Sequence, residues 1–253
     1  MSSEELLDII EDARVRSLDT LDLSGRGITR LPDTIGQLTT LRFLELAENQ
    51  LSTLPPAIEQ LTELRELWLK GNEFVDFPPI RYLSNLTVLD LSSNKLSEIP
   101  PEIEQLKELE SLNLDNTQLS TLPPEIGRLT TLRWLQLRNT PLSTLPPEIG
   151  QLIGLTALDL GSTQLSTLPS EIGQLIELKS LNLDNTQLST LPSEIGQLTT
   201  LRWLYLRNTP LSTLPPEVGQ LTALKLLCLS NTQLDARSLD LVEDLRRYGG
   251  HFH

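Results

Sequence analysis

The chain has 253 residues, with 20 Lys and Arg against 34 Asp and Glu, so its formal charge is −14. This balance argues against nucleic-acid phosphates and anionic lipid surfaces as partners of the whole chain. No apolar run approaches the ~20 residues needed to cross a bilayer, and the acidic start lacks the basic and apolar regions of a signal peptide. We therefore expect a cytoplasmic protein with no nucleic-acid and no membrane partner.

The N-terminal segment predicts a short helix over residues 4–16. Ser2 or Ser3 is a suitable N-cap, and Glu4 and Glu5 are favourable at the positive end of a helix. Apolar residues recur at near-helical spacing, namely Leu6, Leu7, Ile9, Ile10 and Ala13. We expect residues 1–17 to form a cap over the first unit of the segment that follows.

Residues 18–234 contain ten copies of a motif of about 23 residues, of which only the third is one residue short. The motif is L-x-x-L-x-L-x-x-(N/T)-x-L-x-x-L-P-x-x-I-x-x-L-x-x. Its copies begin at Leu18, Leu41, Leu64, Leu86, Leu109, Leu132, Leu155, Leu178, Leu201 and Leu224. Self-similarity at this period predicts a solenoid, in which each unit buries its apolar side against its neighbours.

Each copy predicts one short strand followed by a compact return limb. The L-x-L segment alternates with period two, which places the leucines inward and the x positions in solvent. The Leu-Pro that follows excludes a second central strand, because proline has no N–H to donate. We expect an α/β solenoid, a right-handed β-α superhelix with a parallel sheet on its concave face and short 3₁₀ or helical turns on its convex face.

The ninth motif position changes along the array. It is Asn49, Asn72 and Asn94 in repeats two to four, Arg26 in repeat one, and threonine in repeats five to ten. Because threonine offers one hydroxyl where asparagine offers two donors and an acceptor, we expect weaker locking of the turns from repeat five onward.

Residues 235–253 predict a closing helix and a tail. The helix is indicated by Leu239, Leu241, Val242 and Leu245, with Arg246 and Arg247 in its last turn. Gly249-Gly250 then precedes the two histidines, His251 and His253, which lack the further ligands that a metal site needs.

Catalytic motifs and cofactor-binding motifs are not found. There is no G-x-x-x-x-G-K-[ST] for nucleotide phosphates, no G-x-S-x-G and no H-E-x-x-H. Cys228, the single cysteine, is expected at an outward strand position with only Lys225 to activate it, which is weak support for a reactive thiol. We expect no catalytic residue, no cofactor, no metal and no small-molecule substrate.

The outward positions of the strands, which are the third, fifth, seventh and eighth of the motif, carry half of the chain's ten aromatic residues. Exposed aromatic and arginine side chains are enriched in binding hot spots, so we predict a protein-binding concave face. Its candidate residues are Phe43, Trp68, Trp134, Arg138, Trp203, Tyr205 and Arg207.

The arginines also have a structural interpretation. Asp115 and Asp184 occupy the same motif position one strand before Arg138 and Arg207, so each aspartate can pair with its arginine across the ladder. Such exposed pairs contribute less than ~1 kcal/mol. The two sets are related by a copied block, because residues 109–165 and 178–234 are nearly the same sequence.

The motif closely resembles the leucine-rich repeat (LRR) family over Leu18 to Leu234. The wording L-x-x-L-P-x-x-I-G-Q-L-T-x-L, found at Leu188 to Leu201, is similar to intracellular LRR proteins of the Ras-linked and Roco classes. The opening helix with Leu18-Asp19-Thr20-Leu21-Asp22-Leu23-Ser24 resembles the start of bacterial Roco proteins.

The Roco resemblance implies the LRR arm of a larger regulatory GTPase, which contacts the Ras-like Roc domain and the COR dimerisation domain. GTPase activity would lie in domains absent from these 253 residues. A stand-alone LRR scaffold or a secreted bacterial effector that binds a host protein is the alternative.

Overall fold

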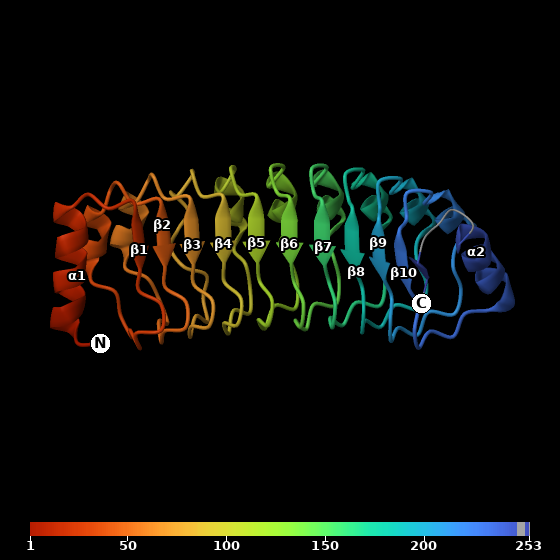
Figure 1. Cartoon of the computed structure of the whole chain (residues 1–253), viewed down its shortest axis with the longest axis horizontal. Helices are drawn as coiled ribbons and strands as arrows, with labels where there is room; N and C mark the ends of the chain where they lie inside the picture. Colours follow the sequence, from red (N-terminus) through yellow and green to blue (C-terminus); the bar gives the residue numbers. More distant parts are fainter. Residues whose placement is uncertain (247–250, 253) are drawn as a thin grey trace.

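The computed structural model describes residues 1–246 and 251–252 as one open, curved solenoid. Its sheet contains eleven parallel strands in chain order, each hydrogen-bonded to the next (Figure 1). The strands are β1 (Thr20–Asp22), β2 (Phe43–Glu45), β3 (Glu66–Trp68), β4 (Val88–Asp90), β5 (Ser111–Asn113), β6 (Trp134–Gln136), β7 (Ala157–Asp159), β8 (Ser180–Asn182), β9 (Trp203–Tyr205), β10 (Leu226–Cys228) and β11 (His251–Phe252).

The return limbs form 3₁₀ helices on the side opposite the strands, which lies behind the sheet in Figure 1. The predicted fold is therefore confirmed. The 3₁₀ helices are η1 (Asp33–Gln37), η2 (Pro56–Gln60), η3 (Pro101–Gln105), η4 (Pro124–Arg128), η5 (Pro147–Gln151), η6 (Ser170–Gln174), η7 (Ser193–Gln197) and η8 (Pro216–Gln220).

The core is a continuous stack of aliphatic side chains between the two layers. The leucines of one repeat, such as Leu132, Leu135 and Leu137, are fully buried, and so is Ile126 from the preceding limb. The register places equivalent residues side by side, with Leu135 opposite both Leu112 and Leu158. The third and fifth motif residues of the strands point away from this core in two parallel rows, which are mostly open to solvent but include the buried Asp90 and Cys228.

The third repeat departs from this pattern because it is one residue short. Between η2 and η3 the described chain forms turns without a 3₁₀ helix. A pocket of about 410 Å³ opens there on the convex side, lined in part by Phe77, Pro78 and Arg81.

The N-terminal helix α1 (Ser3–Val15) begins at Ser2, whose hydroxyl accepts a hydrogen bond from the Glu5 N–H while the Glu5 carboxylate accepts one from the Ser2 N–H. This reciprocal capping satisfies two of the helix's free donors. Leu6, Ile10 and Ala13 are buried against the first repeat.

The C-terminal helix α2 (Ala236–Arg246) packs against the last repeat through Ser238, Val242 and Leu245. The Ser238 hydroxyl accepts a hydrogen bond from the Leu214 N–H at 2.8 Å. Leu239, which the apolar spacing placed on the buried face, is 53% exposed. A polar residue therefore takes the position that the sequence assigned to a leucine.

Beyond α2, the predicted tail is only partly described. Arg247, Gly249-Gly250 and His253 lie outside the described residues. His251 and Phe252 pair in parallel with Leu226 and Leu227, so this segment of the tail extends the sheet by one strand.

The ninth motif position has the structural role that was expected of it. Asn72 Nδ2 donates to the carbonyl oxygens of Leu46 and Leu69, at 2.9 and 3.0 Å, and its Oδ1 accepts from the Leu51 N–H. Thr140 makes one bond, from its hydroxyl to the Leu137 carbonyl of the same repeat. The asparagines therefore tie adjoining turns together, whereas the threonines stabilise only their own turn.

A second ladder, which was not predicted from the sequence, joins repeats five and six and repeats eight to ten; Ser162 interrupts it in repeat seven. At the eighth motif position, asparagines adopt positive φ values of 55° to 62°, a region that asparagine tolerates better than most residues. Asn139 Nδ2 donates to Asn116 Oδ1 at 2.8 Å, and the Asn208–Asn185 pair repeats this contact. These bonds are exposed, so they are weaker substitutes for the buried ladder of repeats two to four.

Candidate protein-binding face

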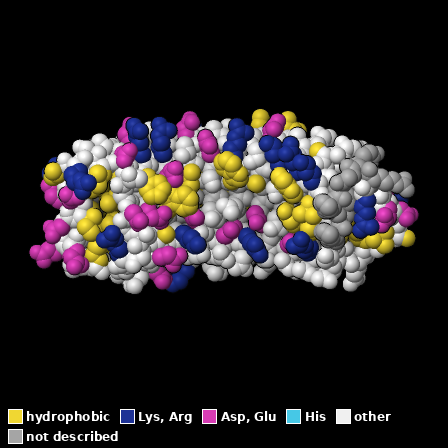
Figure 2. All heavy atoms as spheres, in the orientation of Figure 1, with side chains coloured by type: hydrophobic (Ala, Val, Ile, Leu, Met, Phe, Trp, Pro, Cys, Tyr) yellow, Lys and Arg dark blue, Asp and Glu magenta, His cyan; other side chains and the backbone are white. Residues whose placement is uncertain are grey.

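Two of the three tryptophans are the most exposed aromatic residues on the strand side. Trp134 on β6 is 48% exposed and Trp203 on β9 is 37% exposed. Within the described part of the chain, neither indole makes a ring or cation contact. Figure 2 shows hydrophobic side chains on this face in separate patches. Each tryptophan thus leaves apolar area available to a partner.

The aromatic residues near the N-terminal end are engaged with one another. Phe43 and Trp68 lie with ring centroids 6.5 Å apart at 40°. Trp68 Nε1 donates to the Glu66 carboxylate at 3.2 Å, and both rings are half-buried. This pair forms a preformed apolar patch whose polar group is already satisfied.

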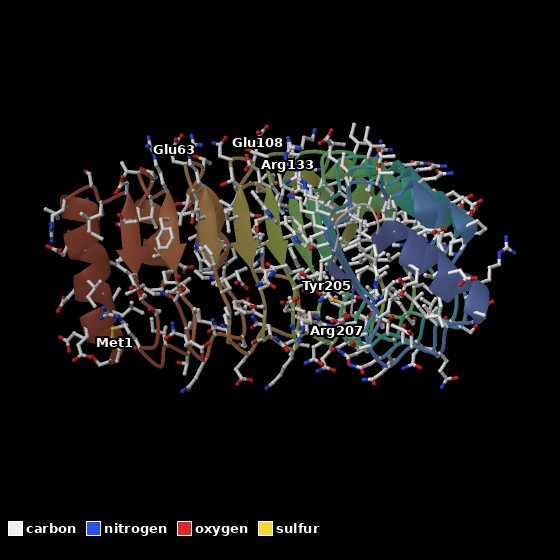
Figure 3. All side chains as sticks on the ribbon, turned by 45° about the vertical axis from the view of Figure 1, so that its right-hand side comes forward. Met1, Glu63, Glu108, Arg133, Tyr205 and Arg207 are labelled. Atoms are coloured by element: carbon white, nitrogen blue, oxygen red, sulfur yellow. The ribbon has the colours of Figure 1, made fainter. Side chains whose placement is uncertain are left out.

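Tyr205 and Arg207 lie together on the same strand and loop (Figure 3). The Arg207 guanidinium lies 5.8 Å from the centre of the Tyr205 ring. Its Nη2 also donates to Cys228 Sγ at 3.0 Å. Cys228, expected to be exposed at an outward position, is instead fully buried, and the Arg207 side chain lies against its sulfur. Its thiol is a structural hydrogen-bond acceptor.

The aspartates before the arginines bind the backbone first. Asp115 Oδ1 accepts from the Arg138 N–H at 2.6 Å, and Asp184 Oδ1 accepts from the Arg207 N–H at 2.7 Å. The predicted side-chain pairing is present for Asp184 and Arg207, whose nearest charged atoms are 3.8 Å apart. Among the described residues no ion pair of this kind joins Asp115 to Arg138. Both arginines remain exposed on the face.

Burial makes these carboxyls harder to ionise. Desolvation, reinforced by the charges of Asp159 and Asp90, raises the pKa of Asp115 to about 6 against the opposing hydrogen bond from Arg138. Desolvation also raises the pKa of Asp184. The middle of the face therefore contains carboxyls whose ionisation is opposed by burial and by their acidic neighbours.

Charged residues on this side of the solenoid recur at the second, fifth and seventh motif positions. Exposed basic residues occupy the second motif position, along the upper margin of the sheet in Figure 2. They are Arg42, Arg65, Arg133, Lys179, Arg202 and Lys225. Acidic residues occupy the fifth and seventh positions, namely Asp22, Glu45, Asp90, Asp115, Asp159 and Asp184. Acidic Glu110 shares the second position, and Arg138 and Arg207 share the seventh, so a partner that crosses the sheet meets charges of both signs.

A hollow of about 430 Å³ lies between Trp134 and Tyr205. It opens over repeat seven, where the outward residue Ala157 is small, and the small Ser180 follows on the next strand. The lining residues are Ser111, Trp134, Leu135, Gln136, Ala157, Leu158, Asp159, Ser180, Asn182 and Tyr205. Trp134 and Tyr205 were predicted as binding residues from the sequence, whereas the hollow between them was not. The signal was a run of small outward residues between two tryptophan-bearing strands.

The features of other site classes are not seen in the described residues. No group of three or more His, Cys, Asp and Glu side chains there has an arrangement suited to a metal ion. None of the described helices combines the length and apolarity needed to span a membrane. The face offers aromatic area, arginines and hydrogen-bonding groups, which are the elements of a protein interface.

Family comparisons agree with this architecture. Profiles described as leucine-rich repeat region match residues 124–181 and 170–250, a two-copy leucine-rich repeat profile matches 84–125, and a third leucine-rich repeat profile matches 16–74. The chain belongs to the leucine-rich repeat family. LRR domains generally bind protein partners, and no catalytic domain is evident in this chain.

Several solved LRR structures share the fold. An LRR protein of Leptospira interrogans is 38% identical with a TM-score of 0.91, over 96% of this chain and 62% of that one. A TDR receptor is 30% identical with a TM-score of 0.82, over 94% of this chain and 44% of the receptor. The plant peptide hormone receptor RGFR1, solved in complex with RGF2, is 29% identical with a TM-score of 0.75, over 87% and 38%. Among curated proteins, none matches the sequence significantly. The chain thus spans less than two thirds of the length of these structural relatives.

Proposed function

We propose that this chain is a non-catalytic scaffold that binds a protein partner through its concave face. The contact residues are Phe43, Trp68, Trp134, Arg138, Trp203, Tyr205 and Arg207. The observation that carries the proposal is the exposure of Trp134 and Trp203 on a rigid sheet, where neither indole fills the core. Burial of such aromatics at an interface typically accounts for a large share of binding energy.

The test uses three single variants and an identified partner. A pull-down with the chain identifies the partner, and calorimetry then measures its affinity for Trp134→Ala, Trp203→Ala and Tyr82→Ala. Tyr82 is the control, because it is 58% exposed but lies in the return limb of repeat three. We expect each tryptophan variant to lose on the order of 2 kcal/mol, about 30-fold in Kd, and Tyr82→Ala to bind normally.

Circular dichroism separates a lost contact from a lost fold. Unchanged affinity of both tryptophan variants, with intact spectra, would eliminate the indoles as anchors. An equal loss for Tyr82→Ala would move the interface away from the concave face.

We further propose that the chain is the LRR arm of a cytoplasmic Roco-type regulatory GTPase and contacts its Roc–COR module. The support is the family-like opening of residues 4–24 and the L-P-x-x-I-G-Q-L wording of the repeats. The reading frame downstream of His253 tests this proposal. A G-x-x-x-x-G-K-[ST] motif following a strand supports it, whereas a stop codon favours a stand-alone scaffold or effector.

A further inference from the structure

The hollow over repeat seven has the dimensions of a side-chain pocket. Its volume of about 430 Å³ lies within the ~300–1,000 Å³ of pockets that hold ligands. Trp134 on β6 and Tyr205 on β9 stand at its two sides, three strand intervals apart. Between them, Ala157 and Ser180 form a low floor. A long side chain from a partner can therefore reach the sheet surface between two aromatic rings.

Asp159 is the one charged residue among those that line the hollow. Its Oδ1 accepts from the Gly161 N–H at 2.9 Å, and none of the ion pairs of the described residues involves its carboxylate. Arg207 pairs with Asp184 and lies over the Tyr205 ring, and the charge of Arg138 acts on Asp115 and Asp184 rather than through an ion pair with Asp159. The floor thus carries a negative charge without a cationic partner.

The uncharged lining residues supply acceptors and an aromatic face. Gln136 and Asn182 flank Asp159 in the strand register, and each has an amide oxygen that can accept a hydrogen bond. Trp134 is the aromatic residue with the strongest attraction for a cation over its ring. A planar cation with several donors matches both features.

Resting on the concave-face function above, we propose that this hollow binds an arginine side chain presented by the protein partner. The guanidinium stacks on Trp134 and donates to the Asp159 carboxylate, with Gln136 and Asn182 accepting the remaining N–H groups. An acidic side chain is repelled by Asp159. An apolar side chain would desolvate the Asp159 carboxylate and the two amides without supplying donors beyond their backbone hydrogen bonds, which is costly. Arginine is favoured over lysine, because its planar fork both stacks and donates bidentately.

The direct test uses the peptide Ac-Gly-Arg-Gly-NH₂ as the probe. The ¹⁵N-labelled protein has three indole signals, from Trp68, Trp134 and Trp203. Titration is expected to shift the Trp134 signal saturably in the millimolar range typical of one isolated side chain, and to leave Trp68 unmoved. The matched peptide with citrulline, which keeps the shape and loses the charge, is expected to bind at least tenfold more weakly, and the lysine peptide severalfold more weakly.

Asp159→Asn is the decisive variant because it removes the charge and keeps the fold. Repeats five and eight already carry Asn113 and Asn182 at this motif position, and each accepts the N–H two residues on, at 3.0 Å. Asp22→Asn, at the same position in repeat one, is the control. We expect Asp159→Asn to lose at least tenfold in affinity for the arginine peptide and Asp22→Asn to lose none.

Several outcomes would overturn the arginine pocket. They are equal binding of the arginine and citrulline peptides, no saturable Trp134 shift, or unchanged binding by Asp159→Asn. The partner identified for the concave face then separates the two proposals. If Trp134→Ala weakens that partner and Asp159→Asn does not, the protein-binding face stands and the arginine pocket fails.

Discussion

The buried asparagine ladder allows a quantitative prediction about Asn72. Its amide group donates to the Leu46 and Leu69 carbonyls and accepts from the Leu51 N–H. Asn49 also donates to Leu46, and Asn94 also donates to Leu69. The three asparagines thus form one chain of bonds across repeats two to four, and removal of Asn72 breaks its middle link.

The magnitude follows from the bonds that each substitution removes. Asn72→Ala deletes three buried hydrogen bonds at about 1 kcal/mol each, and it leaves the Leu51 N–H without its partner. We expect a loss of about 3 kcal/mol. Asn72→Thr keeps the bond to Leu69, as Thr140 does to Leu137, so the loss should be about 2 kcal/mol. Thr140→Val removes one bond and keeps the shape, so we expect about 1 kcal/mol.

Urea unfolding followed by circular dichroism gives the order of the three variants. Because a repeat array can unfold in parts, amide exchange of Leu51 provides a local measure, and its protection should fall most in Asn72→Ala. Equal losses for Asn72→Ala and Thr140→Val would refute the reasoning. So would normal protection of the Leu51 amide in Asn72→Ala.

Two further predictions concern packing and charge. Gly127→Ala should lower the free energy of unfolding by about 1–3 kcal/mol, because the added Cβ would lie 2.5 Å from the Glu148 carbonyl oxygen. In the control Gly219→Ala the Cβ meets only the flexible Leu241 side chain at 3.1 Å, so its urea midpoint should fall less. The reverse order would contradict tight stacking of the 3₁₀ helices. The pKa of Asp115 is raised to about 6 in the folded state, so between about pH 4 and 6 the folded chain holds more protons than the unfolded chain, and stability falls as pH rises. Asp115→Asn should therefore gain stability relative to the parent at pH 7.5 and lose that advantage near pH 4; an equal difference at both pH values would contradict the raised pKa.

The backbone architecture was predictable because every repeat has nearly the same pattern of apolar residues. The L-x-L segment occurs in all ten repeats, and Leu-Pro or its Phe-Pro or Ile-Pro equivalent occurs in nine, so the pattern is clear even where one copy departs from it. The N-terminal cap followed from local rules, since Ser2 and Glu5 form a capping box within a few residues. The loss of hydrogen bonds between repeats was also predictable where threonine replaces asparagine at the ninth position, because the threonine hydroxyl bonds only to the backbone of its own repeat.

Features that depend on several repeats at once were harder to predict. Leu239 matched the apolar spacing, but Ser238 is the residue that bonds to the Leu214 N–H, and no sequence period records a contact across 24 residues. Cys228 alternates outward like other fifth-position residues, yet Arg207 from the preceding repeat reaches over it. The hollow over repeat seven arises where Ala157 and Ser180 have small side chains. A search for prominent side chains overlooks such positions.

Trp134 and Trp203 occupy equivalent places in the two copies of the three-repeat block, but their surroundings differ. Trp134 and Trp203 occupy the same motif position, but their neighbours on the following strand differ: Ala157 pairs with Trp134, and Leu226 pairs with Trp203. At the fifth position of the following strand, the first block has Asp159, which lines the hollow, whereas the second block has Cys228, which is buried. Trp134 therefore borders a hollow that contains a carboxylate, whereas Trp203 borders a surface occupied by the Leu226 side chain. If the hollow contributes to recognition, Trp134→Ala should weaken the partner more than Trp203→Ala, whereas a face that uses only aromatic area should lose similar affinity in both.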